Sequence, residues 1–243
     1  FFKPIHKRGQ NVRLAGEDLK TGTVFLKSGR RLTASDIGLL ASVGITEVRV
    51  RRKIRVAFFS TGDELRSLGE ILKIGEVYDS NRYTLYGLLQ DFGADLHDMG
   101  VVKDDPLLLE KALSSAAKNN DAVITSGGVS VGEADHIKSV LQSIGEIKFW
   151  KIMMKPGRPL AFGKIGNADF FGLPGNPVSV MITFLQFVLP ALSKMAGERE
   201  SSPLEITVKT TKLIKKTPGR TEFQRGVLTI NKNGAAVVTP LEA

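Results

Sequence analysis

The residues best suited to chemistry lie between Thr125 and Asp135 and read Thr-Ser-Gly-Gly-Val-Ser-Val-Gly-Glu-Ala-Asp. The preceding run, Asp121-Ala122-Val123-Ile124, predicts a buried strand, and apolar residues at helical spacing follow in 137–144. A strand, a glycine-rich turn and a helix in this order are typical of a loop whose backbone N–H groups face an anion. Gly127 and Gly128 have no Cβ, so a phosphate can approach the backbone closely.

The acidic end of the same loop indicates a second ligand. Glu133 and Asp135 place carboxylates beside the predicted phosphate. Carboxylates and phosphate oxygens are compatible when a hard cation such as Mg²⁺ lies between them. We therefore expect a phosphate site that also holds a divalent cation.

Polar loops also follow the other predicted strands. In open α/β sheets, ligands bind outside the carboxyl ends of the strands, so these loops should share one edge. They are Thr61-Gly62-Asp63-Glu64, Asp79-Ser80-Asn81, Asp104-Asp105-Pro106, the loop at 125–135, Lys155-Pro156-Gly157-Arg158 and Pro174-Gly175-Asn176-Pro177.

Together these loops predict a single anion site. The backbone amides of Gly127 and Gly128 would hold a phosphate. Glu64 and Asp135, with Asp104 or Asp63, would hold the cation, and Lys151, Lys155 and Arg158 would counter a second anion. Phosphoryl chemistry depends mostly on positioning and electrostatics, so these residue types suffice. The sequence has no P-loop, and Ser126 lacks the context of a nucleophile elbow.

Each loop also has a purely structural interpretation. Helix capping is the favoured role for Asp79 and Ser80, and Asp105 before Pro106 is a typical cap. Pro174 and Pro177 could simply stiffen a turn, and Lys155 and Arg158 could form a solvated basic face.

The elements that must position these residues begin at Ile54, where strands and helices start to alternate. Strands are predicted at 54–60, 95–102, 121–125, 149–153, 160–165 and 168–173, and helices at 81–92, 107–118, 135–144 and from 178. This order predicts an α/β fold, a three-layer domain with a mostly parallel sheet, over residues 51–200.

Two smaller parts flank this domain. Residues 1–50 are mixed, with a helix that opens at Thr33 and ends at Gly44, and a strand at 45–50. Residues 201–243 predict short antiparallel strands at 205–212, 224–230 and 235–239, which belong to a small β domain cut off at Ala243.

Composition excludes several classes of protein. The 243 residues contain no cysteine, which excludes disulfides, and the three histidines lack zinc-ligand spacing. The net charge of +9 fits nucleic-acid binding or a basic surface that attracts small anions; scattered basic residues and few aromatics favour small anions. The apolar run 178–192 is short and interrupted, so it predicts a buried helix and not a membrane span.

The loop motifs resemble the MoeA family of molybdopterin molybdotransferases, to which the E domain of gephyrin is related. The resemblance rests on Thr61–Leu65, Asp79–Arg82, Asp104–Pro106, Ser126–Asp135, Lys155–Pro159, Leu173–Pro177, Thr217–Arg220 and Phe223–Gly226. MogA-type adenylyltransferases share the α/β domain but carry a G-G-T-G loop. The corresponding loop of this chain reads G-G-V-S-V-G-E-A-D, which is similar to the loop of MoeA proteins.

The resemblance implies a reaction in which adenylylated molybdopterin and molybdate yield molybdenum-molybdopterin and AMP, with Mg²⁺ or another divalent cation. It also implies a homodimer whose cleft uses loops of both subunits, and transient contact with the adenylyltransferase is expected. The absence of cysteine fits a cytoplasmic location. Neither a specific nucleic acid nor a membrane is expected as a partner.

The resemblance also assigns roles to residues of this chain. Glu64 and Asp135 would bind the cation with help from Asp104, and Lys151, Lys155, Pro174 and Pro177 would line the molybdate and pterin region. Asp18 and Arg225 would reach the cleft from the flanking domains. The remaining substrate-binding candidates are Gly62, Asp63, Ser80, Asn81, Ser126, Gly127, Gly128, Ser130, Arg158, Gly175 and Asn176.

Two departures and two alternatives accompany this assignment. Family members have a longer N-terminal portion with a hinge domain, and a complete C-terminal β domain, so the chain is expected to be a truncated form. The alternatives are a non-catalytic dimeric scaffold of the gephyrin E type and a molybdopterin adenylyltransferase. Clustered carboxylates favour catalysis over scaffolding.

Overall fold

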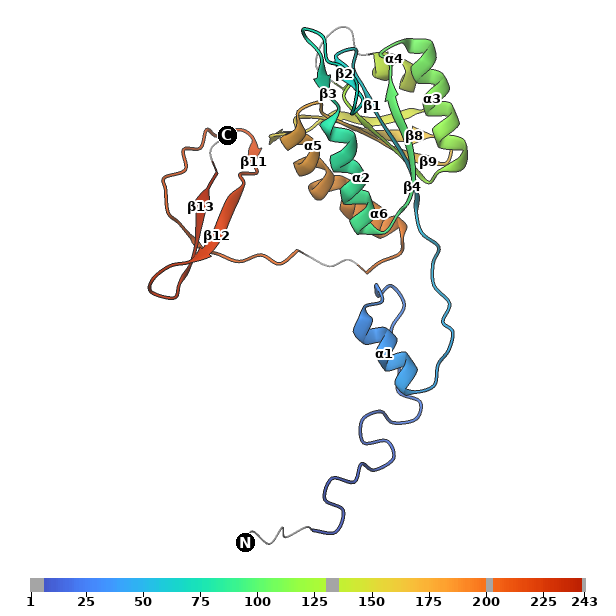
Figure 1. The fold of residues 1–243 in the computed structure, drawn as a ribbon, viewed down its shortest axis with the longest axis vertical. Coiled ribbons are helices and arrows are strands. Elements are labelled where there is room, and N and C mark those ends of the chain that lie inside the picture. Colours follow the sequence, from blue (N-terminus) through green and yellow to red (C-terminus); the bar gives the residue numbers. More distant parts are fainter. Residues whose placement is uncertain (1–6, 130–135, 200–202, 242–243) are drawn as a thin grey trace. The chain divides into compact units, whose positions relative to one another are not determined.

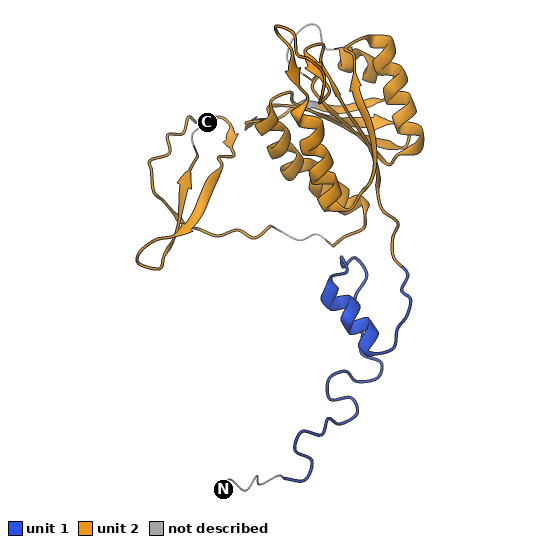
Figure 2. Cartoon of the chain, viewed as in Figure 1, with its two compact units in different colours: residues 1–49 blue, residues 50–243 orange. Residues whose placement is uncertain are grey.

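The computed structural model describes residues 7–129, 136–199 and 203–241. The chain divides into two units, Phe1–Arg49 and Val50–Ala243 (Figure 2). The first unit contains helix α1 (Ala34–Ser42), which begins at the predicted place because Thr33 and Asp36 form a capping box. Arg30 pairs with Asp36, and this hydrogen bond together with that from Thr33 lowers the pKa of Asp36 to about 2.

The prediction of a strand at residues 45–50 is wrong. These residues have no regular structure, and no described strand pairs with them. Alternation of apolar and polar residues favours an extended backbone, but a strand also needs a hydrogen-bonded neighbour.

The second unit is built on a six-stranded sheet (Figure 1). Its order is β4 (Asp95–Val102), β1 (Arg55–Thr61), β5 (Ala122–Ser126), β9 (Ala168–Leu173), β8 (Pro159–Ile165) and β6 (Glu146–Lys151). The first four strands are parallel, and β8 is antiparallel to both β9 and β6. The mostly parallel sheet is thus confirmed, although β6 begins three residues before the strand predicted at 149–153.

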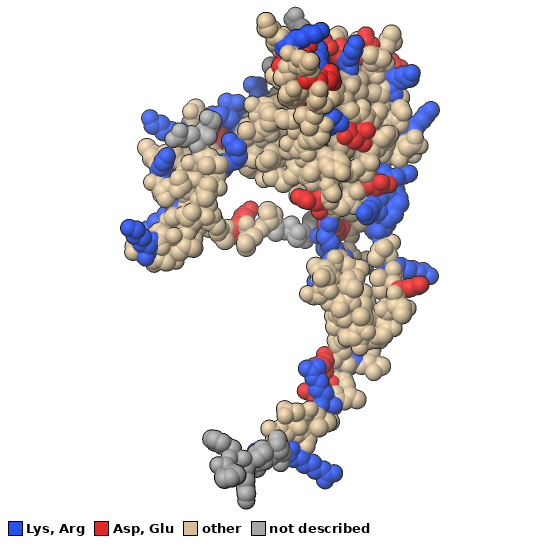
Figure 3. Space-filling view, viewed as in Figure 1, with Lys and Arg blue, Asp and Glu red and all other residues tan. Residues whose placement is uncertain are grey.

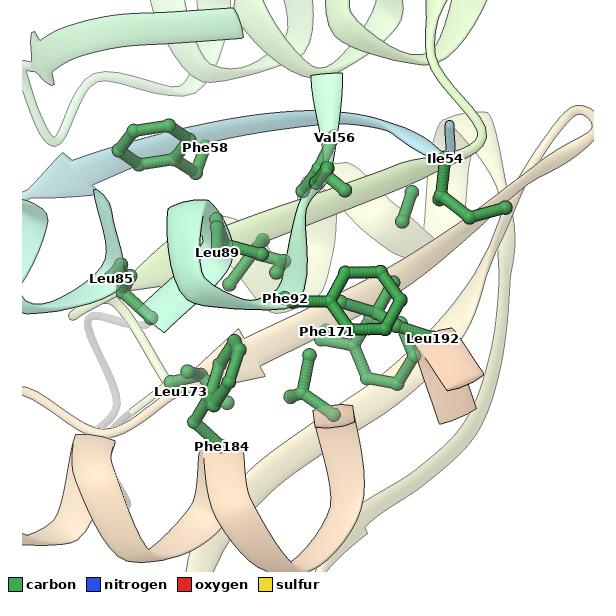
Figure 4. Close-up of a cluster of buried hydrophobic side chains, with 14 of the residues drawn as sticks. Ile54, Val56, Phe58, Leu85, Leu89, Phe92, Phe171, Leu173, Phe184 and Leu192 are labelled. Carbon is green, nitrogen blue, oxygen red and sulfur yellow. The ribbon is translucent and has the colours of Figure 1, made fainter. Parts of the chain in front are cut away.

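Helices cover both faces of this sheet, which explains the continuous apolar run of β1. Val56 and Phe58 pack with Leu85 of α2 (Ser80–Phe92) in the cluster drawn in Figure 4. Ala57 and Phe59 point the other way, into a second cluster built with α3 (Pro106–Asn119) and α4 (His136–Ile144). A strand covered on both faces must be apolar at successive positions.

The last helical segment runs through α5 (Pro177–Thr183), the π-helix η1 (Phe184–Val188) and α6 (Leu189–Met195). Pro190 has no N–H to donate to the preceding turn, which accounts for the wider turn before it. Residues 177–195 are long and apolar enough to cross a membrane, but this is weak evidence. Val180, Phe184, Val188 and Leu192 are buried in the core, as expected of a core helix.

The remaining strands are short. β2 (Leu65–Arg66) and β3 (Val77–Tyr78) pair within an insertion after β1 that the sequence did not reveal. At the C-terminal end, β12 (Gly226–Ile230) and β13 (Ala236–Pro240) are antiparallel. The strand predicted at 205–212 is reduced to β10 (Lys209–Thr210), and it pairs with β13 in parallel, so the all-antiparallel prediction is wrong there.

One further pairing joins the C-terminal part to the α/β core. β11 (Thr221–Glu222) lies parallel to β7 (Met154–Lys155), with Lys155 opposite Glu222.

Candidate active site

Strand directions bring the predicted polar loops to one edge of the sheet. The carboxyl ends of β4, β1, β5 and β9 meet there because these strands are parallel. β6 runs in the same direction, since two antiparallel steps through β8 separate it from β9. The loop after β6, with Lys155 and Arg158, therefore reaches the same edge as the loops that follow β1, β4, β5 and β9.

The glycine turn after β5 packs directly on the end of β1. Gly127 has φ +86°, and a Cβ there would lie 2.2 Å from the carbonyl oxygen of Thr61. Gly128 has φ +66°, and a Cβ there would lie 2.6 Å from Ile137 Cδ1. Both positions therefore require glycine for the fold itself, whether or not an anion binds.

The backbone N–H of Gly127 has a protein partner. It donates to the carbonyl oxygen of Leu173 at 3.1 Å, which ties the ends of β5 and β9 together. The predicted phosphate contact of the turn therefore depends on Gly128 more than on Gly127. Ser126, also proposed to bind substrate, is buried and its Oγ donates to the carbonyl oxygen of Pro174 at 3.4 Å.

The second half of the motif lies outside the described residues. Ser130, Glu133 and Asp135 are in the segment 130–135, so their proposed roles stay predictions.

Three predicted carboxylates follow the ends of two neighbouring strands, β1 and β4. Burial raises the pKa of Asp104, His136 lowers it, and Asp63 and Glu64 raise it further. Asp63 and Glu64 are exposed on the turn after β1, whereas Asp104 is half-buried after β4. This concentration of negative charge is suited to a cation.

A metal site is not complete in the part of the chain that the structure describes. No group of three His, Cys, Asp or Glu side chains there is arranged to hold an ion. The oxygen donors are of the type that Mg²⁺ prefers, and one of them, Asp104 Oδ1, is buried without a hydrogen-bond partner. The donor chemistry therefore fits the cation, with Asp135 as the predicted ligand still to be placed.

Buried oxygens without partners mark the same edge. Within the described residues they are Thr61 Oγ1, Asn81 Oδ1, Asp104 Oδ1 and Thr125 Oγ1. Each belongs to the carboxyl end of a strand or to the loop or helix start beside it. An unpaired buried oxygen costs about 1–3 kcal/mol, so its position calls for a polar partner. The loops that contain Thr61 and Thr125 were predicted, but their hydroxyls were not singled out, because a threonine in a strand is ordinary.

The helix starts around the site are fixed by capping. Asp79 caps α2 as predicted, and its carboxylate also accepts a hydrogen bond from Ser60 Oγ at 2.9 Å. Asp105 caps α3, also as predicted. Asn176 caps α5 through its side-chain oxygen, a role that the sequence did not separate from substrate binding.

Two of the predicted substrate loops touch each other. Asn81 Nδ2 donates to the carbonyl oxygen of Gly175 at 2.7 Å, which joins the start of α2 to the turn between Pro174 and Pro177. Ser80 is exposed at the first position of α2, so the capping role predicted for Ser80 is wrong. The turn at Gly62 is close to Glu64, because a Cβ on Gly62 would lie 2.6 Å from Glu64 Oε2.

The basic residues line the part of the edge that follows β6. Lys151, Lys155 and Arg158 are exposed. Lys155 Nζ lies 3.8 Å from Glu222 Oε1, and Lys216 Nζ lies 3.7 Å from the same oxygen. No sequence pattern pointed to Glu222 or Lys216, because their place depends on the pairing of β7 with β11.

The two residues expected from the flanking regions remain predictions. Asp18 pairs with Arg13 inside the first unit, whose position relative to the second is not described. The carbonyl oxygen of Arg225 accepts a hydrogen bond from Leu241 N at 2.9 Å in the C-terminal sheet.

Charge on the visible surface is mixed. On the face in Figure 3, basic and acidic side chains are interspersed and form no single basic stripe. This distribution fits small anionic ligands better than a nucleic-acid backbone.

Two protein-family models match this chain. Residues 57–194 match the family described as "Probable molybdopterin binding domain". Residues 3–44 match the family described as "MoeA N-terminal region (domain I and II)".

Known proteins agree with these matches. A molybdopterin molybdenumtransferase of Haemophilus influenzae is 47% identical over 234 residues, covering 96% of this chain and 58% of the relative. One of Nostoc sp. is 41% identical and covers 81% of this chain and 46% of the relative. The solved structure of the molybdopterin biosynthesis moea protein from Pyrococcus horikosii is 32% identical with a TM-score of 0.79, over 94% of this chain and 55% of that one.

The chain thus spans about half the length of the relatives it matches. The family resemblance predicted from the loop motifs is confirmed. Because the two family models together cover most of its residues, the N-terminal one specific to MoeA, and one relative is 47% identical along nearly all of it, the chain belongs to the MoeA family.

Proposed function

We propose that this chain inserts molybdate into adenylylated molybdopterin and releases AMP, in the biosynthesis of the molybdenum cofactor. One observation carries the proposal: the segments that contain Glu64, Asp104, Gly128 and Lys155 all follow strands whose carboxyl ends share one edge of the sheet. The names of the similar proteins from Haemophilus influenzae and Nostoc sp. support the same activity.

Each group has a role that its chemistry permits. The turn at Gly127–Gly128 would orient the phosphate, while Asn81 and the turn Pro174–Pro177 would contact the remainder of the substrate. Lys151, Lys155 and Arg158 would hold the molybdate dianion by charge, since a lysine acts as a point charge toward an oxyanion.

Glu64, Asp104 and Asp135 would hold Mg²⁺ or another divalent cation. When bound, such a cation would neutralise phosphate charge and polarise a phosphoryl oxygen. Among the described residues, the unpaired oxygen of Asp104 supports this role.

The remaining features of the proposal concern the protein that contains this chain. We propose that its domains lie at residues 1–50, 51–200 and 201–243. We also propose that the protein is a cytoplasmic homodimer, in which Asp18 and Arg225 reach into a cleft formed by both subunits. It would contact the adenylyltransferase transiently. The enzyme names of the similar proteins favour catalysis over the scaffold alternative.

The test is AMP release from adenylylated molybdopterin with molybdate and Mg²⁺. We expect release that depends on both additions and falls at least tenfold in Glu64→Gln. Glu110→Gln, an exposed carboxylate on α3, is the control and should match the unsubstituted protein. Failure to release AMP from a folded protein would refute the proposal.

A further inference from the structure

The backbone of Lys155 is held by the C-terminal part of the chain. Thr221 N donates to the carbonyl oxygen of Met153 at 3.0 Å, and Phe223 N donates to that of Lys155 at 2.9 Å. These bonds form the β7–β11 pair and place residue 222 directly opposite residue 155. A segment more than sixty positions away in the sequence is therefore the immediate neighbour of a predicted molybdate ligand.

In this position the Glu222 carboxylate lies close to the side chains of two lysines. Its side chain is only 12% exposed, and its Oε1 lies 3.8 Å from Lys155 Nζ and 3.7 Å from Lys216 Nζ. Gln224 Nε2 donates to the other carboxylate oxygen at 3.5 Å. A carboxylate so far removed from water is compatible with folding when cations surround it.

Lys216 is itself held in place. Its Nζ donates to the carbonyl oxygen of Thr217 at 3.0 Å and to that of Arg220. An ammonium group has three donors, so one remains for a further acceptor. The turn Thr217–Arg220 thus fixes the second cation before any ligand arrives.

The cluster of Lys155, Lys216 and Glu222 carries two positive charges and one negative charge. The lysine side chains stay 61% and 44% exposed, so an anion can reach them. Free lysine side chains lose much rotamer freedom when they bind an anion, and side chains that are already ordered lose less.

We propose that Glu222 is a positioning residue that holds Lys155 and Lys216 together, so that the two ammonium groups bind one doubly charged tetrahedral oxyanion. This rests on the proposed function, in which Lys155 contacts molybdate. It adds Lys216 to the binding site and makes the C-terminal segment part of it.

Whether Glu222→Gln tightens or weakens anion binding distinguishes a positioning role of Glu222 from simple charge repulsion. If Glu222 only repelled the anion, Glu222→Gln would tighten binding, because a negative charge leaves the site. If Glu222 positions the lysines, the same substitution weakens binding although the site becomes more positive.

The first experiment measures initial rates against molybdate concentration. We expect Glu222→Gln and Lys216→Met each to raise the half-saturating concentration about three- to tenfold with kcat within about twofold, which is the size of effect that one or two charge contacts produce. Glu222→Asp should restore part of the loss. Lys215→Met removes the same charge one residue away and should change the value by less than about twofold.

A double substitution tests whether Glu222 acts through Lys155. In a Lys155→Met background, Glu222→Gln should add less than about twofold, because the group it positions is gone. Tighter binding in Glu222→Gln, an equal effect of Lys215→Met and Lys216→Met, or full additivity with Lys155→Met would each overturn the proposal.

A second readout does not need turnover. Binding of inorganic molybdate, measured by calorimetry, should weaken most in Glu222→Gln and Lys216→Met, less in Glu222→Asp and least in Lys215→Met. The Phe223 amide should keep its hydrogen-exchange protection in Glu222→Gln. This order without turnover upholds the proposal while the proposed function fails. Normal turnover in the unsubstituted protein with tighter molybdate binding in Glu222→Gln overturns the proposal alone. If the unsubstituted, folded protein shows neither turnover nor molybdate binding, both the proposal and the proposed function are overturned.

Discussion

At the scale of single residues, Asp104 illustrates a carboxylate whose position is unfavourable for stability. Burial raises its pKa above the usual 3.8, Asp63 and Glu64 add to this, and its Oδ1 is buried without a partner among the described residues. Because the folded pKa lies above the unfolded one, ionised Asp104 lowers stability at neutral pH, and this penalty disappears below about pH 3.8.

We therefore expect Asp104→Asn to leave the melting temperature at pH 7 unchanged or higher while turnover falls at least tenfold. Any gain in stability should vanish in melting curves recorded below about pH 4. Asp105→Asn is the matched control: the adjacent carboxylate is exposed and caps α3, and asparagine caps equally well. A lower melting temperature with intact turnover in Asp104→Asn would instead make Asp104 structural.

Gly127 gives a second prediction at this scale. With φ +86° and a Cβ that would lie 2.2 Å from Thr61 O, Gly127→Ala combines backbone strain with a collision against backbone. We expect a loss of roughly 2–5 kcal/mol in unfolding free energy, measured by urea denaturation.

Gly75 has the same φ of +86° with open space around its missing Cβ. Gly75→Ala should therefore lose only the strain, about 1–2 kcal/mol. Equal losses in the two variants would mean that β1 and β5 move apart easily at this end.

At the scale of elements, local signals predicted well where the cause was local. Asp105 with Pro106, and Thr33 with Asp36, set the starts of α3 and α1, because capping involves only neighbouring residues. The short pairs β7–β11 and β2–β3 were missed because two-residue strands leave no period to detect. The prediction of a strand at 45–50 was wrong although the alternating pattern is present, because a segment without a partner strand does not form a strand.

An ion-pair cluster around Asp121 lies at the amino ends of β1 and β5. Arg52 Nη2 donates to Asp121 Oδ1 at 2.8 Å, and the backbone N of Arg55 donates to Asp121 Oδ2 at 2.9 Å. Arg52 first, with Arg55, lowers the pKa of Asp121 far below its usual range despite partial burial. The cluster links the starts of β1 and β5, at the end of the sheet opposite the candidate site.

Asp121→Asn should lower the unfolding free energy at pH 7 by about 1–2 kcal/mol, because charge-assisted hydrogen bonds are lost from a partly exposed cluster. A depressed folded pKa stabilises above the unfolded value, so the difference should shrink as pH falls below about 3.8. Urea curves across pH measure this. Turnover should not change, and a loss of turnover with intact stability would contradict the structural role.

At the scale of the whole molecule, the sequence predicted the sheet edge as the candidate site because the direction of parallel strands follows from the alternation of strands and helices. It could not predict a role for Lys216 or Glu222, nor that the hydroxyls of Thr61 and Thr125 are buried without partners among the described residues. Their importance depends on which buried oxygens lack partners and on which distant segment pairs with β7. Such facts arise from tertiary packing and leave no local pattern.

The net charge of +9 acts on every anionic ligand before it makes contact. A positive molecule steers anions toward itself, and salt screens this attraction over a Debye length of about 10 Å at 0.1 M. We expect kcat/KM for adenylylated molybdopterin to fall about three- to tenfold when ionic strength rises from about 0.02 to about 0.3 M, with kcat within about twofold. Steady-state rates in a potassium chloride series measure both constants, and sucrose at matched viscosity controls for slower diffusion. An equal fall in kcat would place the salt effect on bound groups such as the Lys155–Glu222 pair and not on the field of the whole molecule.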